Sequence, residues 1–567
     1  MDISKVESSF IEIGSSKADE RLRRVSILLT ILALLSLSHS IIFSKLEIGY
    51  WGLVHSLPIT FFISLTLLIV AAALLWISRE KNTQLLCLQL LIIIMALALV
   101  PLITGGSITF INHGYRNVGY VEYIARQAHF DPQVTFYLSW PGAFVLSAII
   151  SVLGQIDFTP LIEILPFFLP ILFFLPLYIF MKNTLGESRS KYIWAGLLIF
   201  YMAGSSGVGN LISAGGTAAF LLLTILALVT NHRLWHGDGK PLPIVLLIVI
   251  VFAAMASCHL LTSLATLAIL AVLALVRRNG HLVLAAIIAL SVLLAWNLTV
   301  AGDFIIPRLP FIGEEGFIFN FQLLAEREVT GHIIGSQSHI DVSLIRIIHS
   351  AFFVFIGFAG FLISLFVRRD LRSTISLATI IVIPIPLVVL SNFYAEEIIT
   401  RVYGFISPGL VYFSTRLFDI NKRFMAIIVC VLLLIAIPLK LVANYGNQEF
   451  DYFSPGQKAG TLFFHDNVSK GITFGAWPMG TIENIEQYIS LDLDYLRWYR
   501  NRLVVFPWLS EYGSYYIGIS RQNRASYEWQ QGNTDFIENI EKELQGTVNI
   551  GYIYYSPDLQ LYTYQID

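Results

Sequence analysis

Residues 105–153 read GGSITFINHGYRNVGYVEYIARQAHFDPQVTFYLSWPGAFVLSAIISVL, and this stretch decides how the chain is organised. It follows an apolar segment directly. It contains the densest group of titratable side chains in the N-terminal half, which comprises His113, Arg116, Glu122, Arg126, His129 and Asp131. An aromatic patch with Tyr137 and Trp140 comes next, and a Pro-Gly break then leads into a short apolar helix. We expect a loop that the rest of the chain, a hydrophobic frame, holds against a membrane surface.

The composition is that of a membrane protein. The 567 residues are 56% hydrophobic and only 13% charged, and the mean hydropathy is +0.71. A soluble chain of this length needs more charged side chains to cover its surface. The net charge of −2 argues against nucleic acid as a partner. The three cysteines lie in apolar segments, so we interpret them as core residues and expect neither a disulfide framework nor a cysteine-based metal site.

Apolar runs of membrane-spanning length recur between Val25 and Val442. They are continuous, as in helices, and do not alternate as the strands of a membrane barrel do. The fold class is therefore a polytopic α-helical membrane protein. We place about thirteen spans at residues 25–44, 57–77, 84–104, 160–181, 191–206, 208–230, 242–258, 259–277, 280–300, 346–367, 373–392, 402–418 and 423–442, which together form a transmembrane domain over 25–442.

Basic residues orient these spans, because Lys and Arg gather in cytoplasmic loops. Three arginines before the first span place residues 1–24 in the cytoplasm. The apolar helix at 143–154 must then lie on the outer surface, since roughly a dozen residues are too few to cross a membrane. With this choice the loops at 105–159 and 301–345 and the C-terminal residues 443–567 share the outer face.

Residues 443–567 are expected to form a separate soluble α/β domain outside the membrane. Helices are predicted at about 455–467, 481–490 and 535–545, and strands at 472–476, 503–506, 515–520, 550–555 and 560–564. The last two strands are joined by Ser556-Pro557-Asp558, which is typical of a hairpin turn.

Two short motifs of the first long loop resemble a known family. Residues 121–126 read VEYIAR, and residues 137–142 read YLSWPG. This order of polar loop, helix and aromatic Pro-Gly turn resembles the first outer loop of GT-C fold membrane glycosyltransferases. In particular it resembles the archaeal and bacterial relatives of dolichyl-phosphate-mannose-protein mannosyltransferases and aminoarabinose transferases. The resemblance covers about residues 84–567. It implies a polyprenyl-phosphate sugar donor bound from the outer leaflet and an inverting transfer assisted by an acidic residue of this loop.

The chain departs from the family pattern at that acid. The family places it, usually as Asp, a few residues before the helix, whereas residues 111–117 read INHGYRN and contain no carboxylate. Three residues remain open as the catalytic base: His113, whose imidazole can take a proton near neutral pH, Glu122 and Asp131. A further interpretation is that the protein is not a transferase.

Two side chains later in the chain are candidates to hold the donor's phosphate together with Arg116. His259 interrupts an apolar stretch, and its Ser-x-His-x-Leu-Thr pattern resembles one found in archaeal GT-C-like proteins. Arg401 begins an apolar helix, and a guanidinium suits a bidentate phosphate contact. The structural alternatives are a hydrogen-bonded core histidine and an ion pair between Arg401 and Glu397.

The 301–345 loop contains two histidines and several carboxylates. Their spacing matches no metal-ligand motif, and the length of the loop suggests a lid. The predicted site therefore includes no metal ligand, and a divalent cation is left open as a cofactor. Tyr137 and Trp140 are candidates to face a sugar or the membrane interface.

Together these observations predict a multi-pass cell-membrane glycosyltransferase. It would move a sugar from a polyprenyl-phosphate-linked donor to a glycan or protein acceptor on the outer face. The alternative is a noncatalytic GT-C-like protein that binds lipid or glycan or scaffolds a cell-surface complex, and the missing acid favours it. A transporter is a weaker hypothesis, because charged residues are almost absent from mid-membrane positions.

Overall fold

The fold is described from a computed structural model, which covers most of the chain. The described residues are 3–78, 82–104, 112–156, 158–186, 189–204, 213–236, 241–308, 334–368, 371–387, 398–447, 452, 454–468, 471–474, 488–491, 498–499, 502–503, 514–547 and 549–565.

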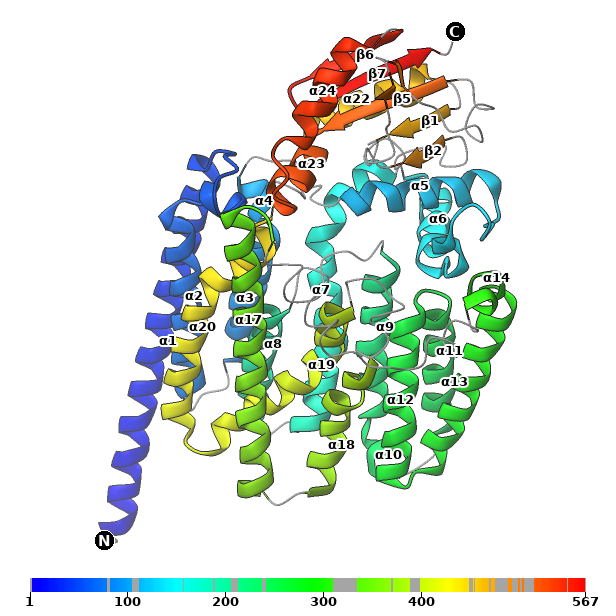
Figure 1. Cartoon of the computed structure of the whole chain (residues 1–567). Helices are drawn as coiled ribbons and strands as arrows, with labels where there is room; N and C mark the ends of the chain where they lie inside the picture. Colours follow the sequence, from blue (N-terminus) through cyan, green and yellow to red (C-terminus); the bar gives the residue numbers. More distant parts are fainter. Residues whose placement is uncertain are drawn as a thin grey trace.

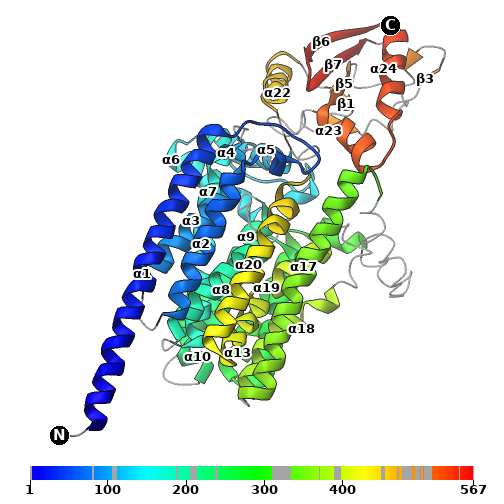
Figure 2. The same ribbon diagram turned by 90° about the vertical axis from the view of Figure 1, so that its left-hand side faces the viewer.

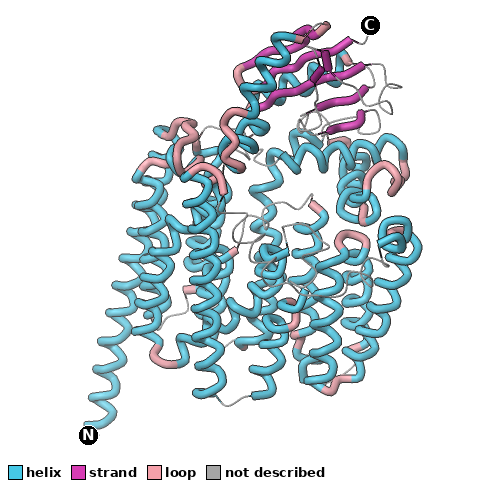
Figure 3. The backbone as a smooth tube through the Cα atoms, viewed as in Figure 1, coloured by secondary structure: helices cyan, strands magenta, loops and turns pink. Residues whose placement is uncertain are grey.

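Helices make up one large bundle, with a small sheet at one of its ends (Figures 1 and 3). The bundle helices are α1 (Ile3–Phe43), α2 (Ile59–Ile77), α3 (Thr83–Ala98), α4 (Val100–Ile103), α7 (Phe158–Leu185), α8 (Ser190–Ala203), α9 (Ala214–Val229), α10 (His232–His236), α11 (Leu242–Ala256), α12 (Leu260–Arg277), α13 (Gly280–Thr299), α14 (Gly302–Ile305), α17 (Gln337–Ile363), α18 (Leu371–Val382), α19 (Ile398–Ser414) and α20 (Lys422–Tyr445).

Length and composition mark six helices of the described chain as able to cross a membrane. They cover Lys17–Phe43, Ile59–Ile77, Leu260–Arg277, Gly280–Thr299, Gln337–Val367 and Lys422–Tyr445. Seven shorter apolar helices accompany them, including α6 described below. A multi-pass helical membrane protein is thus confirmed. Every predicted span overlaps a helix, while the number of thirteen crossings stays a prediction.

A cap of short helices covers the end of the bundle that lies opposite the N-terminus (Figures 1 and 2). It consists of α5 (Asn112–Gln127), the short helix η2 (Phe136–Ser139) and α6 (Gly142–Gly154). The 13 residues of α6 are fewer than a membrane crossing needs. Phe144 of α6 is buried, whereas Leu153 is 80% exposed, so one face of α6 packs inward and the other is apolar and open.

The sheet of the C-terminal region lies at the same end as this cap (Figures 1 and 3). Its strand order is β2-β1-β5-β7-β6. The strands are β1 (Gly471–Phe474), β2 (Tyr488–Leu491), β5 (Ser514–Ser520), β6 (Ile550–Ser556) and β7 (Leu559–Gln565). β1 pairs in parallel with β2 and β5, whereas β7 pairs antiparallel with β5 and β6. A short pair, β3 (Trp498–Tyr499) with β4 (Arg502–Leu503), forms a second sheet.

Alternation along β5 explains why helices cover both faces of this sheet. Tyr515 and Ile517 pack in one cluster with α24 (Phe536–Gly546). Tyr516 points to the other face and packs with Phe464 of α22 (Pro455–Asn467). The result is a helix-sheet-helix sandwich of the predicted α/β kind.

The hairpin predicted at 550–564 is confirmed as β6 and β7, and the helices predicted at 455–467 and 535–545 correspond to α22 and α24. The helix predicted at 481–490 is wrong at its end, because Tyr488–Leu491 is strand β2. Pairing with β1 fixes this segment, with Ile489 opposite Ile472, and such tertiary pairing overrides local pattern.

Two more helical elements were not predicted as such. After β5 the chain forms α23 (Arg521–Arg524) and η14 (Ala525–Gln530). The loop predicted over 301–345 ends earlier than expected, because α17 begins at Gln337 and places His339 on its first turn, and its role as a lid stays a prediction. Residues 309–333 of that loop lie outside the described residues.

Candidate functional site

Two tryptophan side chains, one on the cap formed by α5, η2 and α6 and one on the bundle, attach the cap to the bundle. The indole Nε1 of Trp140 donates to Asn297 Oδ1 at 3.3 Å, and the indole of Trp296 on α13 donates back to the carbonyl of Ser139 at 3.1 Å. Trp140 is buried and packs edge-on against Phe304. Trp140 therefore joins the cap to α13 and α14, and its contact with a sugar stays a prediction.

The start of α6 is fixed by a glycine. The backbone N–H of Gly142 donates to the carbonyl of Ser257 at 2.8 Å, in the turn between α11 and α12. A Cβ at Gly142 would collide with the Ser257 hydroxyl and come within 2.9 Å of Cys258 Sγ. Only glycine allows this close approach. The YLSWPG motif thus places the cap directly over the turn that carries His259.

His259 is the N-cap of α12. Its ring Nδ1 accepts from the backbone N–H of Thr262 at 3.2 Å and lies 2.9 Å from the Thr262 hydroxyl. The residue is 6% exposed. This is the hydrogen-bonded core histidine considered in the sequence, but it also lies near a cation, because the charge of Arg401 acts on its imidazole. His259 and Arg401 thus lie in the same part of the bundle.

Arg401 on α19 lies over the first turn of α9. A Cβ added to Gly215 would collide with the Nη1 atom of Arg401 and sit 3.3 Å from its Cζ. Ser213 caps the same helix by accepting from the Gly216 N–H at 2.9 Å. The guanidinium therefore occupies space that a glycine leaves at a helix N-terminus. Glu397, the alternative partner considered for Arg401, lies outside the described residues.

This corner carries two sources of positive potential. The N-terminus of α9 presents the positive end of its dipole and the backbone N–H groups of its first turn. Arg401 adds a full charge beside it. A helix N-terminus and a guanidinium both favour an anion with several oxygens, such as a phosphate. Gly215 was not predicted as a site residue, and the adjacent glycines in SAGG were the signal that could have identified it.

The three candidate bases differ in what the structure describes of them. The side chains of residues 112–116 lie outside the description, so His113 and Arg116 are placed only on the first turns of α5. Glu122 is half-buried on α5, which contacts both α6 and α7. Asp131 Oδ1 accepts from the Gln133 N–H at 2.9 Å and so closes a turn.

The Asp131 turn is part of the cap's attachment. The Gln133 amide donates to Asp303 Oδ2 at 3.0 Å, near α14. Tyr137, in η2, is half-buried with its ring 5.6 Å from that of Tyr120 on α5. These contacts give the polar residues after α5 a structural function in the cap.

Within the described ranges, no group of three or more His, Cys, Asp or Glu side chains is arranged to hold a metal ion. The donor set at His259 and Arg401 contains one neutral nitrogen ligand and one cation, which does not fit a divalent metal. A divalent cation stays a prediction.

No protein-family model matches the chain, and no curated protein sequence matches it. Solved structures of an archaeal oligosaccharyltransferase from Archaeoglobus fulgidus do. Its form tethered to an acceptor peptide with the NVT sequon is 14% identical, with a TM-score of 0.50, over 84% of this chain and 73% of that chain. Its complex with Zn and sulfate is 14% identical, with a TM-score of 0.49, over 82% and 72%.

The chain has a GT-C-like fold. The likeness extends over most of both chains, and it agrees with the resemblance in the VEYIAR and YLSWPG motifs. At this level of identity the comparison shows the fold, and function has to be argued from the site.

Proposed function

We propose that the protein is a membrane glycosyltransferase that uses a polyprenyl-phosphate-linked sugar. The observation that carries the proposal is the corner where Arg401 lies on Gly215 at the start of α9, beside His259. A lipid phosphate placed there would accept from the guanidinium and from backbone N–H groups. The corner lies under a cap whose helix α6 has an open apolar face, which suits the lipid portion of such a donor.

The proposed transfer is a single displacement at the anomeric carbon of the donor sugar. The acceptor's nucleophile forms a bond to the anomeric carbon while the bond from that carbon to the phosphate oxygen breaks. The electron pair leaves with the lipid phosphate, whose growing negative charge Arg401 stabilises. The acceptor's proton passes to a base of the cap.

Glu122 is the candidate that we favour for this base, with His113 as the alternative. Asp131 is less suited, because one of its oxygens already closes the turn with Gln133. Glu122 is the second residue of the VEYIAR motif and lies on a regular element, helix α5.

The acceptor is proposed to be a protein or a glycan, because the similar Archaeoglobus structure was solved with an acceptor peptide. We place the cap and the sheet outside the cytoplasm. Basic residues at the opposite end of the bundle support this orientation: Arg277 and Arg278 lie between α12 and α13, and Lys422 begins α20 (Figure 1).

A second function remains open, a noncatalytic protein of the same fold that binds lipid or glycan. The observation favouring it is that residues 111–117 contain no carboxylate, while Asp131 is engaged in a turn. Lipid binding without transfer distinguishes this alternative from the enzyme.

Purified full-length protein in lipid nanodiscs tests both. Dolichyl phosphate binding is measured first, and release of dolichyl phosphate from its mannosyl and glucosyl derivatives is then measured with a sequon peptide or membrane glycan extract as acceptor. The enzyme requires binding and acceptor-dependent release. Release that is lost in Glu122→Gln and retained in Asp131→Asn identifies Glu122 as the base, whereas release retained in Glu122→Gln leaves His113 as the base. Binding with no release in any combination supports the noncatalytic alternative, and no binding at all overturns both.

A further inference from the structure

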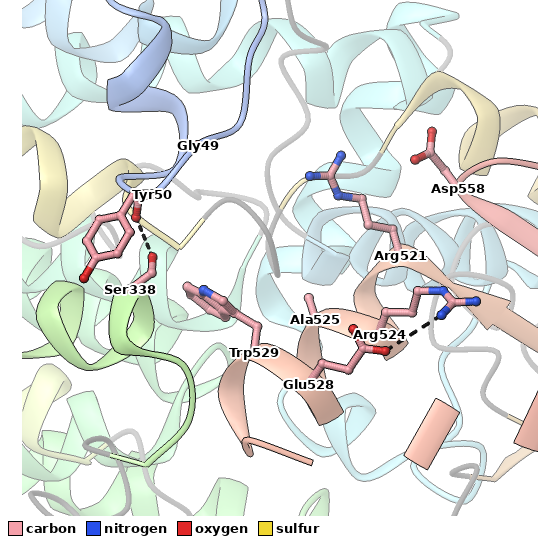
Figure 4. A pocket seen from close by; sticks show the side chains of 9 residues that line it. All are labelled: Gly49, Tyr50, Ser338, Arg521, Arg524, Ala525, Glu528, Trp529 and Asp558. Carbon is pink, nitrogen blue, oxygen red and sulfur yellow. Dashed lines mark hydrogen bonds and ion pairs between the residues drawn. The ribbon is translucent and has the colours of Figure 1, made fainter. Parts of the chain in front are cut away.

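A second recess lies away from the candidate site, between the bundle and the C-terminal sheet (Figure 4). Its volume is about 530 Å³, which falls within the usual range for small-molecule pockets. The loop between α1 and α2 contributes Gly49 and Tyr50, the first turn of α17 contributes Ser338, and α23, η14 and the β6–β7 turn contribute the rest. None of these residues belongs to the corner around Arg401.

One wall of the recess is aromatic, and its two rings are held in place. Trp529 projects toward Tyr50 and Ser338 in Figure 4. The carbonyl of Trp529 accepts from the Ser336 N–H at 2.7 Å, and its ring packs edge-on against His339 at 4.6 Å. Tyr50 is 45% exposed, and its hydroxyl donates to Asp341 at 2.7 Å. Fixed aromatic faces of this kind supply contact area at low entropic cost.

The other side of the recess carries charges of both signs. Arg524 pairs with Glu528 at 3.8 Å (Figure 4), and it also pairs with Glu541. The backbone N–H of Arg521 donates to the carbonyl of Asp558 at 2.9 Å, and the guanidinium of Arg521 lies 5.7 Å above the Tyr452 ring. The lining thus contains two arginines and two carboxylates, so its formal charge is zero.

The zero formal charge of the lining favours an uncharged ligand. A phosphate or nucleotide would meet Glu528 and Asp558 as well as the two arginines, and like charges repel it. A neutral ligand rich in hydroxyl groups can donate to the carboxylates and accept from the guanidinium groups at once. Its apolar C–H faces can pack against Trp529 and Tyr50. Neutral carbohydrate has all three properties.

We propose that this recess is a binding site for a neutral saccharide. The site goes beyond the transfer reaction, because its residues are separate from those assigned to the donor phosphate. It lies at the same end of the bundle as the cap, on the face where the acceptor is proposed to arrive (Figures 1 and 2). A sugar held there is bound by the bundle and the sheet together.

The test measures binding to the full-length protein in nanodiscs, with no lipid-linked donor present. The probes are neutral oligosaccharides of mannose, glucose and N-acetylglucosamine. Their binding is measured by calorimetry and by saturation-transfer NMR. We expect binding of at least one probe, and a loss of about tenfold in affinity in Trp529→Leu and in Tyr50→Ala. Both residues contact the start of α17, so thermal denaturation of each variant is measured alongside to show that the loss of affinity is not a loss of folding. Tyr555→Ala is the control, because Tyr555 is 67% exposed and lies outside the recess.

Two outcomes overturn the proposal. One is that no neutral oligosaccharide binds, or that those that bind do so equally in Trp529→Leu and Tyr50→Ala. The other is that inorganic phosphate competes with the sugar or binds in its place, which would make the recess an anion site. Because no donor is present, either failure leaves the proposed transfer reaction untouched, and loss of transfer leaves sugar binding measurable.

Discussion

Two cations of the bundle, the buried Lys440 and the half-buried Arg401, lie at opposite ends of helices: Lys440 at the end of α8 and Arg401 at the start of α9. This difference distinguishes a structural cation from one that can bind a ligand. Lys440 on α20 is 4% exposed, and its Nζ donates to the carbonyl of Gly204 just after α8. His349 Nε2 lies 2.9 Å from the carbonyl of Met202, and the Tyr403 hydroxyl donates to that of Ala203 at 3.0 Å. Side chains from α17, α19 and α20 thus meet three consecutive carbonyls where α8 ends.

Arg401 is on the same helix as Tyr403, yet it lies at the beginning of α9. The C-terminus of a helix is its negative end, so Lys440 is stabilised by the protein itself. The N-terminus is the positive end, where a bound anion gains from the dipole and a cation does not. Lys440 is therefore a structural brace in this comparison, and Arg401 is the cation positioned for a ligand.

Substitution of Arg401 should give the largest effect on binding. Arg401→Gln removes a charge-assisted contact to phosphate, which is worth roughly 1.5–3 kcal/mol, so dolichyl phosphate affinity should fall by on the order of 10–100-fold. The thermal midpoint should change less than in the Lys440 variant below. Affinity is measured in nanodiscs and stability by thermal denaturation of the same preparations. A large loss of stability with unchanged affinity would make Arg401 a structural residue like Lys440.

Substitution of Lys440 should give the converse result. Lys440→Met keeps the length of the side chain but leaves the Gly204 carbonyl without its donor, which should cost roughly 1–3 kcal/mol of folding stability. Dolichyl phosphate affinity should be retained in the folded fraction. Lys422→Met is the matched control, because Lys422 is exposed at the start of the same helix. Equal thermal midpoints of the two variants would show that Lys440 is not a structural brace.

A glycine tests the placement of Arg401 without changing its charge. In Gly215→Ala the new methyl group would collide with the Arg401 guanidinium, so the side chain must shift. We expect a loss of about tenfold in dolichyl phosphate affinity, because the displaced guanidinium loses part of a charge-assisted contact to phosphate that is worth roughly 1.5–3 kcal/mol. Gly404→Ala on α19 is the control, because a Cβ there meets no atom within 4 Å. Equal affinity in both variants would mean that the guanidinium position does not matter for the ligand.

The sequence was sufficient for the elements that a local pattern determines. Continuous apolar runs predicted the bundle helices, and alternation with a turn signal predicted β6 and β7. His259 and Arg401 were singled out because a titratable group inside an apolar run is costly unless it has a purpose.

What the sequence could not supply depends on contacts between distant segments. Strand β2 forms because it pairs with β1. The helix-like pattern of residues 481–490 does not reveal this pairing. Gly215 matters only because α19 brings Arg401 to it. The hydrogen bonds around Lys440 join four helices, and the recess at Trp529 joins the bundle to the sheet. Because the residues of each come from distant segments, no short sequence motif marks either of them.

The smallest effect is expected at Glu528 in the C-terminal region. There, burial of the carboxyl and its ion pair with Arg524 act in opposite directions. Burial raises the pKa of the Glu528 carboxyl above its ordinary value of 4.5, although the Arg524 charge opposes this. A raised pKa means that the folded state holds the proton more tightly, so the stabilising contribution of this carboxyl is fully present below pH 4.5 and is lost as pH rises through the raised pKa.

Glu528→Gln mimics the protonated form at every pH. Its thermal midpoint should equal that of the wild type near pH 4 and exceed it by about 1–2 °C at neutral pH. Glu538→Gln, an exposed neighbour on α24, controls for the loss of one negative charge in this domain. If Glu528→Gln instead melts below the wild type at neutral pH, pairing with Arg524 outweighs burial, and Glu528 would resemble Lys440 in being stabilised by its partner.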